Sequence, residues 1–374
     1  MAYKSKTIKN NLEPKNMKLA TYKDGTKDGQ LVVVSKDLTQ AHYASNIATK
    51  MQQLLDDWNF ISPQLEDLYQ TLNSGRARHA FPFDPKMCMA PLPRAYQWAD
   101  GSAYINHVEL VRAARGVEVP ANFYTDPLLY QGGSDDFLGP TDPVRCPSED
   151  FGIDFEGELA VITADVAMQT DSNDAISAVR LIMLANDVSL RNLIPEEMTK
   201  GFGFYQSKPA TAFSPVAVTP DELGEAWSKG RVHLTLTCTW NGRRVGMCEA
   251  GSEMTFGFGE LIAHAAKTRN IRAGSVFGSG TISNKAVEKN GKKDWPKGYS
   301  CIAEKRAMEM LLTGEMSTPF MRYGDTIRLE MKGLDGQSLF GSIDQRVAPL
   351  QDPQVPAISE LVEPSSGENS QGQK

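Results

Sequence analysis

Cysteine is scarce in this chain of 374 residues: there are five, an odd number, and no two form a CxxC pair. A disulfide framework or a zinc site is therefore not expected, and a reducing compartment, the cytoplasm, is the expected location. No apolar run reaches the roughly 18 residues that a membrane span needs. The first sixteen residues contain lysines but no apolar stretch after them, so a secretory signal is not expected either.

An excess of positive charge is also missing. The formal net charge is −7, whereas a nucleic-acid-binding surface is normally basic, so no nucleic-acid partner is expected. A hydrophobic content of 41% with 23% charged residues is ordinary for a globular protein with a substantial core. The length favours about two domains.

The chain is expected to divide into a flexible leader (1–16), a small N-terminal domain (17–90), a larger domain (91–350) and a disordered tail (351–374). The boundary between the domains is set by a segment with four prolines, "AFPFDPKMCMAPLPR", which resists regular structure. The tail is polar and rich in proline, serine, glycine and glutamine, a composition that cannot bury enough apolar surface to fold.

Local patterns predict several secondary-structure elements. Two short strands are expected within 17–35, around a "DGTKDG" turn, and a helix near 41–72. The apolar run at 175–185 is expected to be a helix that covers a sheet. The segments 231–247 and 325–343 alternate between apolar and polar residues and contain Asn-Gly and Asp-Gly, so each predicts a β-hairpin.

The stretch "DFEGELAV" places Glu156 and Glu158 in an apparent strand that continues into an apolar run. Side chains two apart on a strand point to the same face, so both carboxylates should lie side by side. If they are buried, a divalent cation between them is the economical way to offset their charge, and oxygen ligands select Mg²⁺, Ca²⁺ or Mn²⁺. The alternative is an exposed sheet edge where both are solvated.

Three further residues have the same two interpretations. Asp187 in "LANDVSLRN" is a metal ligand or a turn residue after an apolar segment, and Asp100 in "QWADGSAYINH" is a ligand or part of a plain Asp-Gly turn. Lys208 in "FYQSKPATAFSP" is an active-site cation or a solvated loop lysine.

The order of these motifs resembles the fumarylacetoacetate hydrolase family, in its longer two-domain form, over about residues 17–348. The shared features are an Asp followed by a His, "YQGG", "EGE", "NDVSLR", "KP", "GSGT" and a late Glu. The resemblance implies an α+β, β-rich fold with mixed sheets rolled around the active site, a smaller N-terminal domain, and a homodimer.

The resemblance also implies roles for individual residues. It makes His107 the general base, oriented by Glu304, although Glu309 is nearby in the chain, and it makes Lys208 the active-site lysine. The implied metal ligands are Asp100, Glu156, Glu158 and Asp187. The implied substrate contacts are Tyr130, Arg191 and Thr281.

The sequence departs from the family at two substrate-contacting positions. Ile194 stands where the animal-type hydrolase has a glutamine, and Ser102 stands where a tyrosine is expected. These departures leave the metal chemistry plausible and put the identity of the acyl group in doubt.

The function expected from the resemblance is metal-dependent hydrolysis of a carbon–carbon bond in a small β-diketo acid, such as fumarylacetoacetate or an acylpyruvate, in the catabolism of tyrosine or other aromatic compounds. Retention of His107 and Glu304 favours hydrolysis, because water must be activated. One alternative is decarboxylation, isomerisation or hydration of a keto acid by the same metal site. Another is a non-catalytic protein that binds a metal or ligand on this scaffold.

Overall fold

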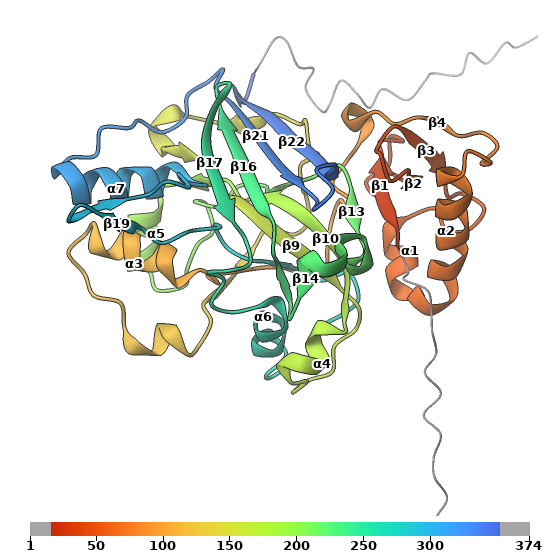
Figure 1. Cartoon of the computed structure of the whole chain (residues 1–374), viewed down its shortest axis with the longest axis horizontal. Coiled ribbons are helices and arrows are strands. Elements are labelled where there is room, and N and C mark those ends of the chain that lie inside the picture. Colours follow the sequence, from red (N-terminus) through yellow and green to blue (C-terminus); the bar gives the residue numbers. More distant parts are fainter. Residues whose placement is uncertain (1–15, 352–374) are drawn as a thin grey trace, which may run out of the picture.

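The computed structural model describes residues 16–351, so the predicted tail and nearly all of the predicted leader lie outside the described residues. The N-terminal part is a four-stranded antiparallel sheet with helices packed against it (Figure 1). Its elements are β1 (Lys18–Tyr22), β2 (Gln30–Val34), β3 (Gln40–Tyr43), α1 (Met51–Asp56), α2 (Trp58–Asn73) and β4 (Phe81–Pro82). The two strands expected within 17–35 are confirmed.

The helix expected near 41–72 begins ten residues later than its predicted start. Residues 40–43 instead form β3, which pairs with β2 and extends the sheet. The helical residues are divided between α1 and α2, on either side of Asp57. The start of this helix depends on which residues pair with β2. The local spacing of apolar residues does not indicate that pairing.

The sheet of the N-terminal part continues into the larger domain, because β1 pairs with β13. The strand order β4-β3-β2-β1-β13-β10-β9-β18-β5-β6, with β12 paired to β10, makes one sheet of eleven strands. Its strands in the larger domain are β5 (Trp98–Gly101), β6 (Leu129–Gly132), β9 (Gly157–Thr163), β10 (Val179–Asn186), β12 (Ala212–Phe213), β13 (Ala217–Val218) and β18 (Val276–Gly278). The two parts therefore share backbone hydrogen bonds as well as a core.

A second sheet has the order β17-β16-β21-β22-β7 and packs against the first. It consists of β7 (Val144–Cys146), β16 (Thr235–Trp240), β17 (Arg243–Glu249), β21 (Thr326–Lys332) and β22 (Ser338–Pro349). Both predicted hairpins are confirmed, β16–β17 and β21–β22. Asn241 and Gly242 both have positive φ, as the tight two-residue turn requires.

The prediction of a helix at 175–185 is wrong. A short helix, α4 (Ser172–Ile176), ends there, and the apolar run forms β10, a central strand with neighbours on both sides. A strand that is buried on both faces is apolar throughout and loses the alternation that identifies a strand. A buried helix gives the same pattern, so periodicity alone could not separate the two.

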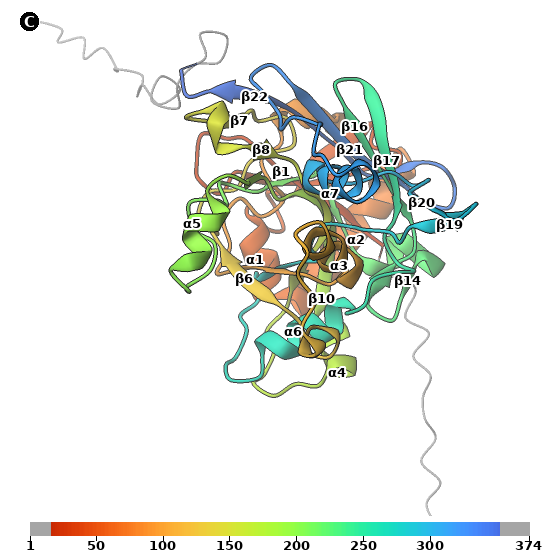
Figure 2. The ribbon, with the colours of Figure 1, turned by 90° about the vertical axis from the view of Figure 1, so that its left-hand side faces the viewer.

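Helices and short ribbons surround the sheets. Helices α3 (Ile105–Ala113) and α7 (Ile302–Thr313) lie next to each other over one side of the sheets (Figure 2). The remaining helices are α5 (Ile194–Thr199) and α6 (Phe258–Ala265). Three two-stranded ribbons account for the other described strands: β8 (Ile153–Asp154) with β11 (Ser189–Leu190), β14 (Trp227–Ser228) with β15 (Arg231–Val232), and β19 (Val287–Lys289) with β20 (Lys292–Asp294).

The expected α+β architecture, with mixed sheets and a smaller N-terminal domain, is confirmed. Within residues 16–351, none of the helices is both long and apolar enough to cross a membrane.

Candidate metal centre and active site

A small cavity of about 110 Å³ lies where β5, β6, β9 and α3 meet, and most of the predicted site residues line it. The two that do not, Asp187 and Glu304, contact residues that do. Segments between Asp100 and Glu304 in the chain are thus brought together at one place. Glu156 and Glu158 line the same cavity, as their alternation predicts.

Three of the four predicted metal-binding acids form a compact cluster. Asp100 on β5, Glu158 on β9 and Asp187 just after β10 are buried, and each offers an oxygen within 4.8 Å of the others. The strand between β5 and β9 is β18, and a Cβ at Gly278 on that strand would come within 2.1 Å of an Asp100 oxygen. Glycine is therefore required there for the Asp100 carboxylate to reach its neighbours.

Within the part of the chain that the structure describes, Glu158 lacks the hydrogen-bond donors that a buried carboxylate needs, whereas Asp100 and Asp187 each accept at least one hydrogen bond. Neither oxygen of Glu158 has a hydrogen-bond partner among residues 16–351. Burial, together with the charges of Asp100 and Asp187, raises the pKa of Glu158 well above its usual range. Burial, with Asp187 adding to it, raises the pKa of Asp100 to about 8. Buried carboxylate oxygens left without donors fit a divalent cation such as Mg²⁺, Ca²⁺ or Mn²⁺.

Glu156, the fourth predicted ligand, lies beside the cluster, and both of its carboxylate oxygens pair with cationic side chains. One of its oxygens pairs with the Arg191 guanidinium, and the other lies 2.6 Å from Nζ of Lys208. Burial alone would raise the pKa of Glu156, but the charges of Lys208 and Arg191 outweigh it and lower that pKa to about 2. Lys208 Nζ also lies 2.6 Å from an Asp187 oxygen, so this lysine bridges Glu156 and the cluster.

His107 and Glu304 form a pair across the α3–α7 contact. Nδ1 of His107 lies 3.0 Å from a Glu304 oxygen, and the Glu304 side chain is buried in the first turn of α7. Nε2 is then the ring nitrogen of His107 left without a hydrogen bond within 16–351. Glu309 accepts hydrogen bonds from Ser317 and Thr318 instead. Of the two late glutamates, Glu304 is therefore the one that contacts His107.

Asp154 is a site residue that the sequence reasoning missed. Its carboxylate is fully buried on β8 and accepts hydrogen bonds from the backbone N–H groups of Ile302 and Ala303, at 2.7 and 2.9 Å. It also lies 2.8 Å from Nε of Arg191. Asp154 thus fixes the start of the helix that carries Glu304 and the arginine that pairs with Glu156. The signal was present, because Asp154 continues the same alternation two residues before Glu156.

The predicted substrate-contacting residues lie around the same cavity. Tyr130 donates its hydroxyl hydrogen to Asp187, and Thr281 is buried in the wall. Arg191 has its guanidinium engaged by Asp154 and Glu156. The two departures from the family pattern, Ser102 and Ile194, also line the cavity, as does Phe204, which the sequence did not single out.

Solved structures establish the class of fold. The chain superposes on a maleylpyruvate hydrolase from Sphingobium sp. SYK-6, in complex with manganese(II) and pyruvate, with a TM-score of 0.58 at 16% identity, covering 90% of this chain and all of the other. It superposes on a probable 2-hydroxyhepta-2,4-diene-1,7-dioate isomerase from Mycobacterium abscessus with a TM-score of 0.60 at 18% identity, with the same coverage. At such identities the likeness concerns the fold alone.

Family models identify the family. Residues 97–348 match the fumarylacetoacetate hydrolase C-terminal model, and residues 17–94 match the fumarylacetoacetase N-terminal domain 2 model. The chain belongs to the fumarylacetoacetate hydrolase family, and the resemblance seen in its motifs is confirmed.

Curated relatives have more than one activity. A mitochondrial oxaloacetate tautomerase of Xenopus laevis is 29% identical over 185 residues, covering 48% of this chain and 53% of that protein. A 2,4-didehydro-3-deoxy-L-rhamnonate hydrolase of Sphingomonas sp. is 28% identical over 162 residues, covering 42% and 53%. The chain thus spans about half the length of these relatives, and the family comprises hydrolases, isomerases and tautomerases that act on small molecules.

Metal binding should stabilise the protein more strongly at high pH. Because the Asp100 pKa is raised to about 8, the metal-free folded state holds a proton that the unfolded chain releases near its ordinary pKa, so stability falls as pH rises towards 8. A cation replaces that proton, and at about 100 times its dissociation constant it adds about 2.7 kcal/mol. Thermal unfolding of chelator-treated protein with MgCl₂ or MnCl₂ should show a larger shift near pH 8 than near pH 6.

The variant Glu158→Gln is the control for that experiment and should lose the metal-induced shift. An equal or larger shift near pH 6 would contradict the assignment of the cluster as the metal centre.

Asp154→Asn should destabilise the fold while preserving the size of the side chain. It removes one of the two carboxylates that pair with the partly buried Arg191 guanidinium, and breaking a buried pair costs about 3–5 kcal/mol. Urea unfolding measures the loss. The matched control is Asp150→Asn, an exposed aspartate four residues earlier, which should leave stability within about 0.5 kcal/mol. An Asp154→Asn variant as stable as the control would mean that Arg191 does not depend on Asp154.

Proposed function

We propose that this protein is a metal-dependent hydrolase that cleaves a carbon–carbon bond in a β-diketo acid such as fumarylacetoacetate or an acylpyruvate. The observation that carries the proposal is the His107–Glu304 pair beside the buried carboxylate cluster. A histidine held at Nδ1 by a buried carboxylate is suited to take a proton from water at Nε2.

The proposed ligands of a divalent cation are Asp100, Glu158 and Asp187, with Glu156 as the fourth. When bound, the cation supplies Lewis acidity and a template for the two oxygens of a diketo acid. Glu156 would join the ligand set through the oxygen that Lys208 now contacts. Lys208 keeps its proton in this setting, because the charges of Asp187 and Glu156 raise its pKa more than burial lowers it.

The proposed reaction begins with removal of a proton from water by His107, whose positive charge is stabilised by Glu304. The hydroxide adds to the carbonyl carbon, and Lys208 offsets the charge on the resulting alkoxide. Collapse of the alkoxide breaks the carbon–carbon bond, and His107 returns its proton to the carbon that leaves. One water is consumed and two products form, a carboxylic acid and a keto compound. Tyr130, Arg191 and Thr281 are proposed to hold the carboxylate end of the substrate.

A second candidate is tautomerisation of a keto acid, favoured by the oxaloacetate tautomerase among the curated relatives. This reaction needs His107 to move a proton between carbon and oxygen, and no water is consumed. Decarboxylation and hydration use the same metal site and belong to the same alternative.

Hydrolysis and tautomerisation give different products from one sample. With acetylpyruvate and MgCl₂ or MnCl₂, the hydrolase should remove the diketo-acid ultraviolet absorbance and release acetate and pyruvate in equal amounts, because the attacking water divides the molecule. With enol-oxaloacetate, a tautomerase should remove the enol absorbance and give keto-oxaloacetate, with no cleavage of the molecule. Product analysis by chromatography distinguishes them. If no member of a series of acylpyruvates is cleaved while enol-oxaloacetate is converted, the hydrolase proposal is overturned and the second candidate is supported.

His107→Gln should lower turnover by about 10²–10⁴-fold, the usual contribution of a general base, and leave metal affinity nearly unchanged. His264→Gln is the control, because His264 lies on α6 and pairs with Asp126 outside the cavity. Steady-state kinetics and metal titration provide the two measurements. Equal turnover in the His107 variant and the wild type would instead favour a non-catalytic binding protein.

Two further properties belong to this proposal. All five cysteines are free thiols, which supports a reducing compartment such as the cytoplasm. A homodimer is proposed from the family resemblance, as is a role in the catabolism of tyrosine or other aromatic compounds.

A further inference from the structure

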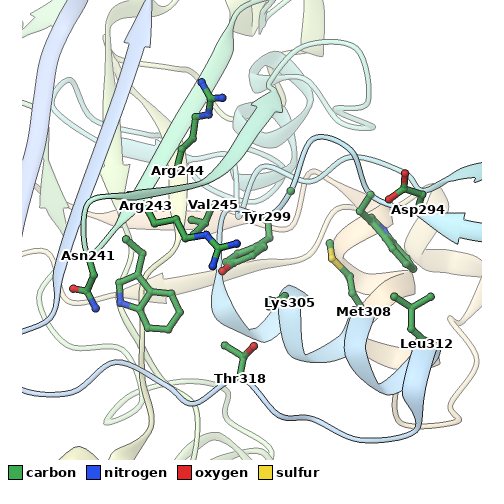
Figure 3. A pocket seen from close by; sticks show the side chains of 13 residues that line it. Asn241, Arg243, Arg244, Val245, Asp294, Tyr299, Lys305, Met308, Leu312 and Thr318 are labelled. Carbon is green, nitrogen blue, oxygen red and sulfur yellow. The ribbon is translucent and has the colours of Figure 1, made fainter.

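A second and larger cavity, of about 710 Å³, lies between the β16–β17 hairpin and helix α7 (Figure 3). It shares no lining residue with the catalytic cavity. Its volume falls in the range of about 300–1,000 Å³ that is usual for small-molecule sites.

The walls of this cavity combine apolar and aromatic side chains with polar ones. Trp240 and Val245 come from the hairpin, and Met308 and Leu312 come from α7. Tyr299 lies between the hairpin and the helix in Figure 3, so that its ring borders both walls. Such a lining matches a ligand with a flat apolar body.

Three hydrogen-bond donors on the lining are uncommitted. Within residues 16–351, the Arg243 guanidinium, the Tyr299 hydroxyl and the Trp295 indole N–H have no hydrogen-bond acceptor, and Arg243 has no carboxylate partner. Burial raises the pKa of Tyr299 to about 12 against the opposing charge of Arg243, so its hydroxyl keeps its proton. Three donors without acceptors fit a ligand that is rich in acceptors and negatively charged.

Among the other polar groups on the lining, Arg244 also has no side-chain partner within residues 16–351 but extends away from Tyr299 in Figure 3, and the remaining groups have partners or lie elsewhere. Thr318 donates to Glu309, and Lys305 pairs with the same glutamate at 3.2 Å. Asn241 bonds to Asp325. The lining also contains one carboxylate, Asp294, which Figure 3 places on the far side of Tyr299 from Arg243. Asp325, which also accepts from the Trp240 indole, is engaged by the hairpin, and no carboxylate within residues 16–351 forms an ion pair with Arg243.

We propose that this cavity is a second ligand site, which binds a carboxylic acid with a flat apolar body. The carboxylate takes two hydrogen bonds from the planar Arg243 guanidinium and a third from the Tyr299 hydroxyl. The apolar body lies along Met308 and Leu312, with the Trp295 N–H bonding any acceptor that it carries. The ligand borders α7, which carries Glu304 towards His107 on its other side.

The neighbouring arginine provides a matched control. Arg243 and Arg244 are both exposed residues of β17 that line the cavity, but only Arg243 turns towards Tyr299 in Figure 3, whereas Arg244 extends away from it. The variants Arg243→Gln and Arg244→Gln remove the same charge from adjacent positions of one strand.

The test is isothermal titration calorimetry of the full chain with 2-naphthoate as the probe. Arg243→Gln should weaken binding by about tenfold or more, because a charge-assisted bidentate contact is lost, whereas Arg244→Gln should change it by less than about twofold. Tyr299→Phe should weaken binding by a smaller factor. Hydrogen exchange with bound probe should protect residues 295–299 and 305–312 in the wild type.

Several outcomes would overturn the proposal. One is equal affinity in Arg243→Gln and the wild type, and another is an equal loss in both arginine variants, which would indicate a diffuse charge effect. Binding of uncharged 2-naphthylmethanol as strongly as 2-naphthoate would remove the role of the carboxylate. Absence of binding, with sedimentation showing that Arg243→Gln dissociates an oligomer, would mean that a second copy of the chain covers the cavity.

Discussion

The larger domain of this protein is organised by one constraint: carboxylates that are buried close together must be offset by positive charge. Asp100, Glu158 and Asp187 meet in the interior, and Glu158 has no donor for either oxygen within 16–351. Lys208 and Arg191 supply positive charge at one side of the group, where they hold Glu156 and Asp187. The charge at Glu158 is not offset in this way, which is why the donor set fits a divalent cation.

The backbone makes room for this arrangement with small residues. Gly278 lies on β18, the strand between β5 and β9. Because it has no side chain, the Asp100 carboxylate can pass over β18 towards Glu158. Gly157, between the two glutamates, faces Leu236 of the second sheet, and a Cβ there would come within 2.7 Å of the leucine. Gly157 therefore sets how closely the two sheets approach, and the glutamates on either side of it point away from that contact. The sequence "EGE" thus combines two carboxylates that face the cavity with one sheet-packing position that faces the core.

Local patterns were sufficient to predict some elements and not others. The hairpins at Asn241-Gly242 and around Asp335-Gly336 were predictable because the turn chemistry is local. The acids of the cluster were found because a strand alternates and because their order matches a family. Residues 175–185 were misassigned because a strand buried on both faces carries no alternation. The pairing of β1 with β13 joins residues about 200 apart in the chain, and local patterns contain no signal for it. The equally distant contact of Glu304 with His107 was predictable only through the family resemblance.

Asp154 shows why the two halves of the site are mechanically connected. Its carboxylate holds the first N–H groups of α7 and, through Arg191, the carboxylate of Glu156. A shift of Arg191 towards a bound substrate would therefore act on Glu156 and on the start of the helix that carries Glu304. The His107–Glu304 pair borders the same cavity as Glu156, whose pKa the charge of His107 helps to lower, so the proton chemistry of His107 is coupled electrostatically to this acid. The group that lies beside Nε2 of His107 then decides whether the pair activates water or transfers a proton directly.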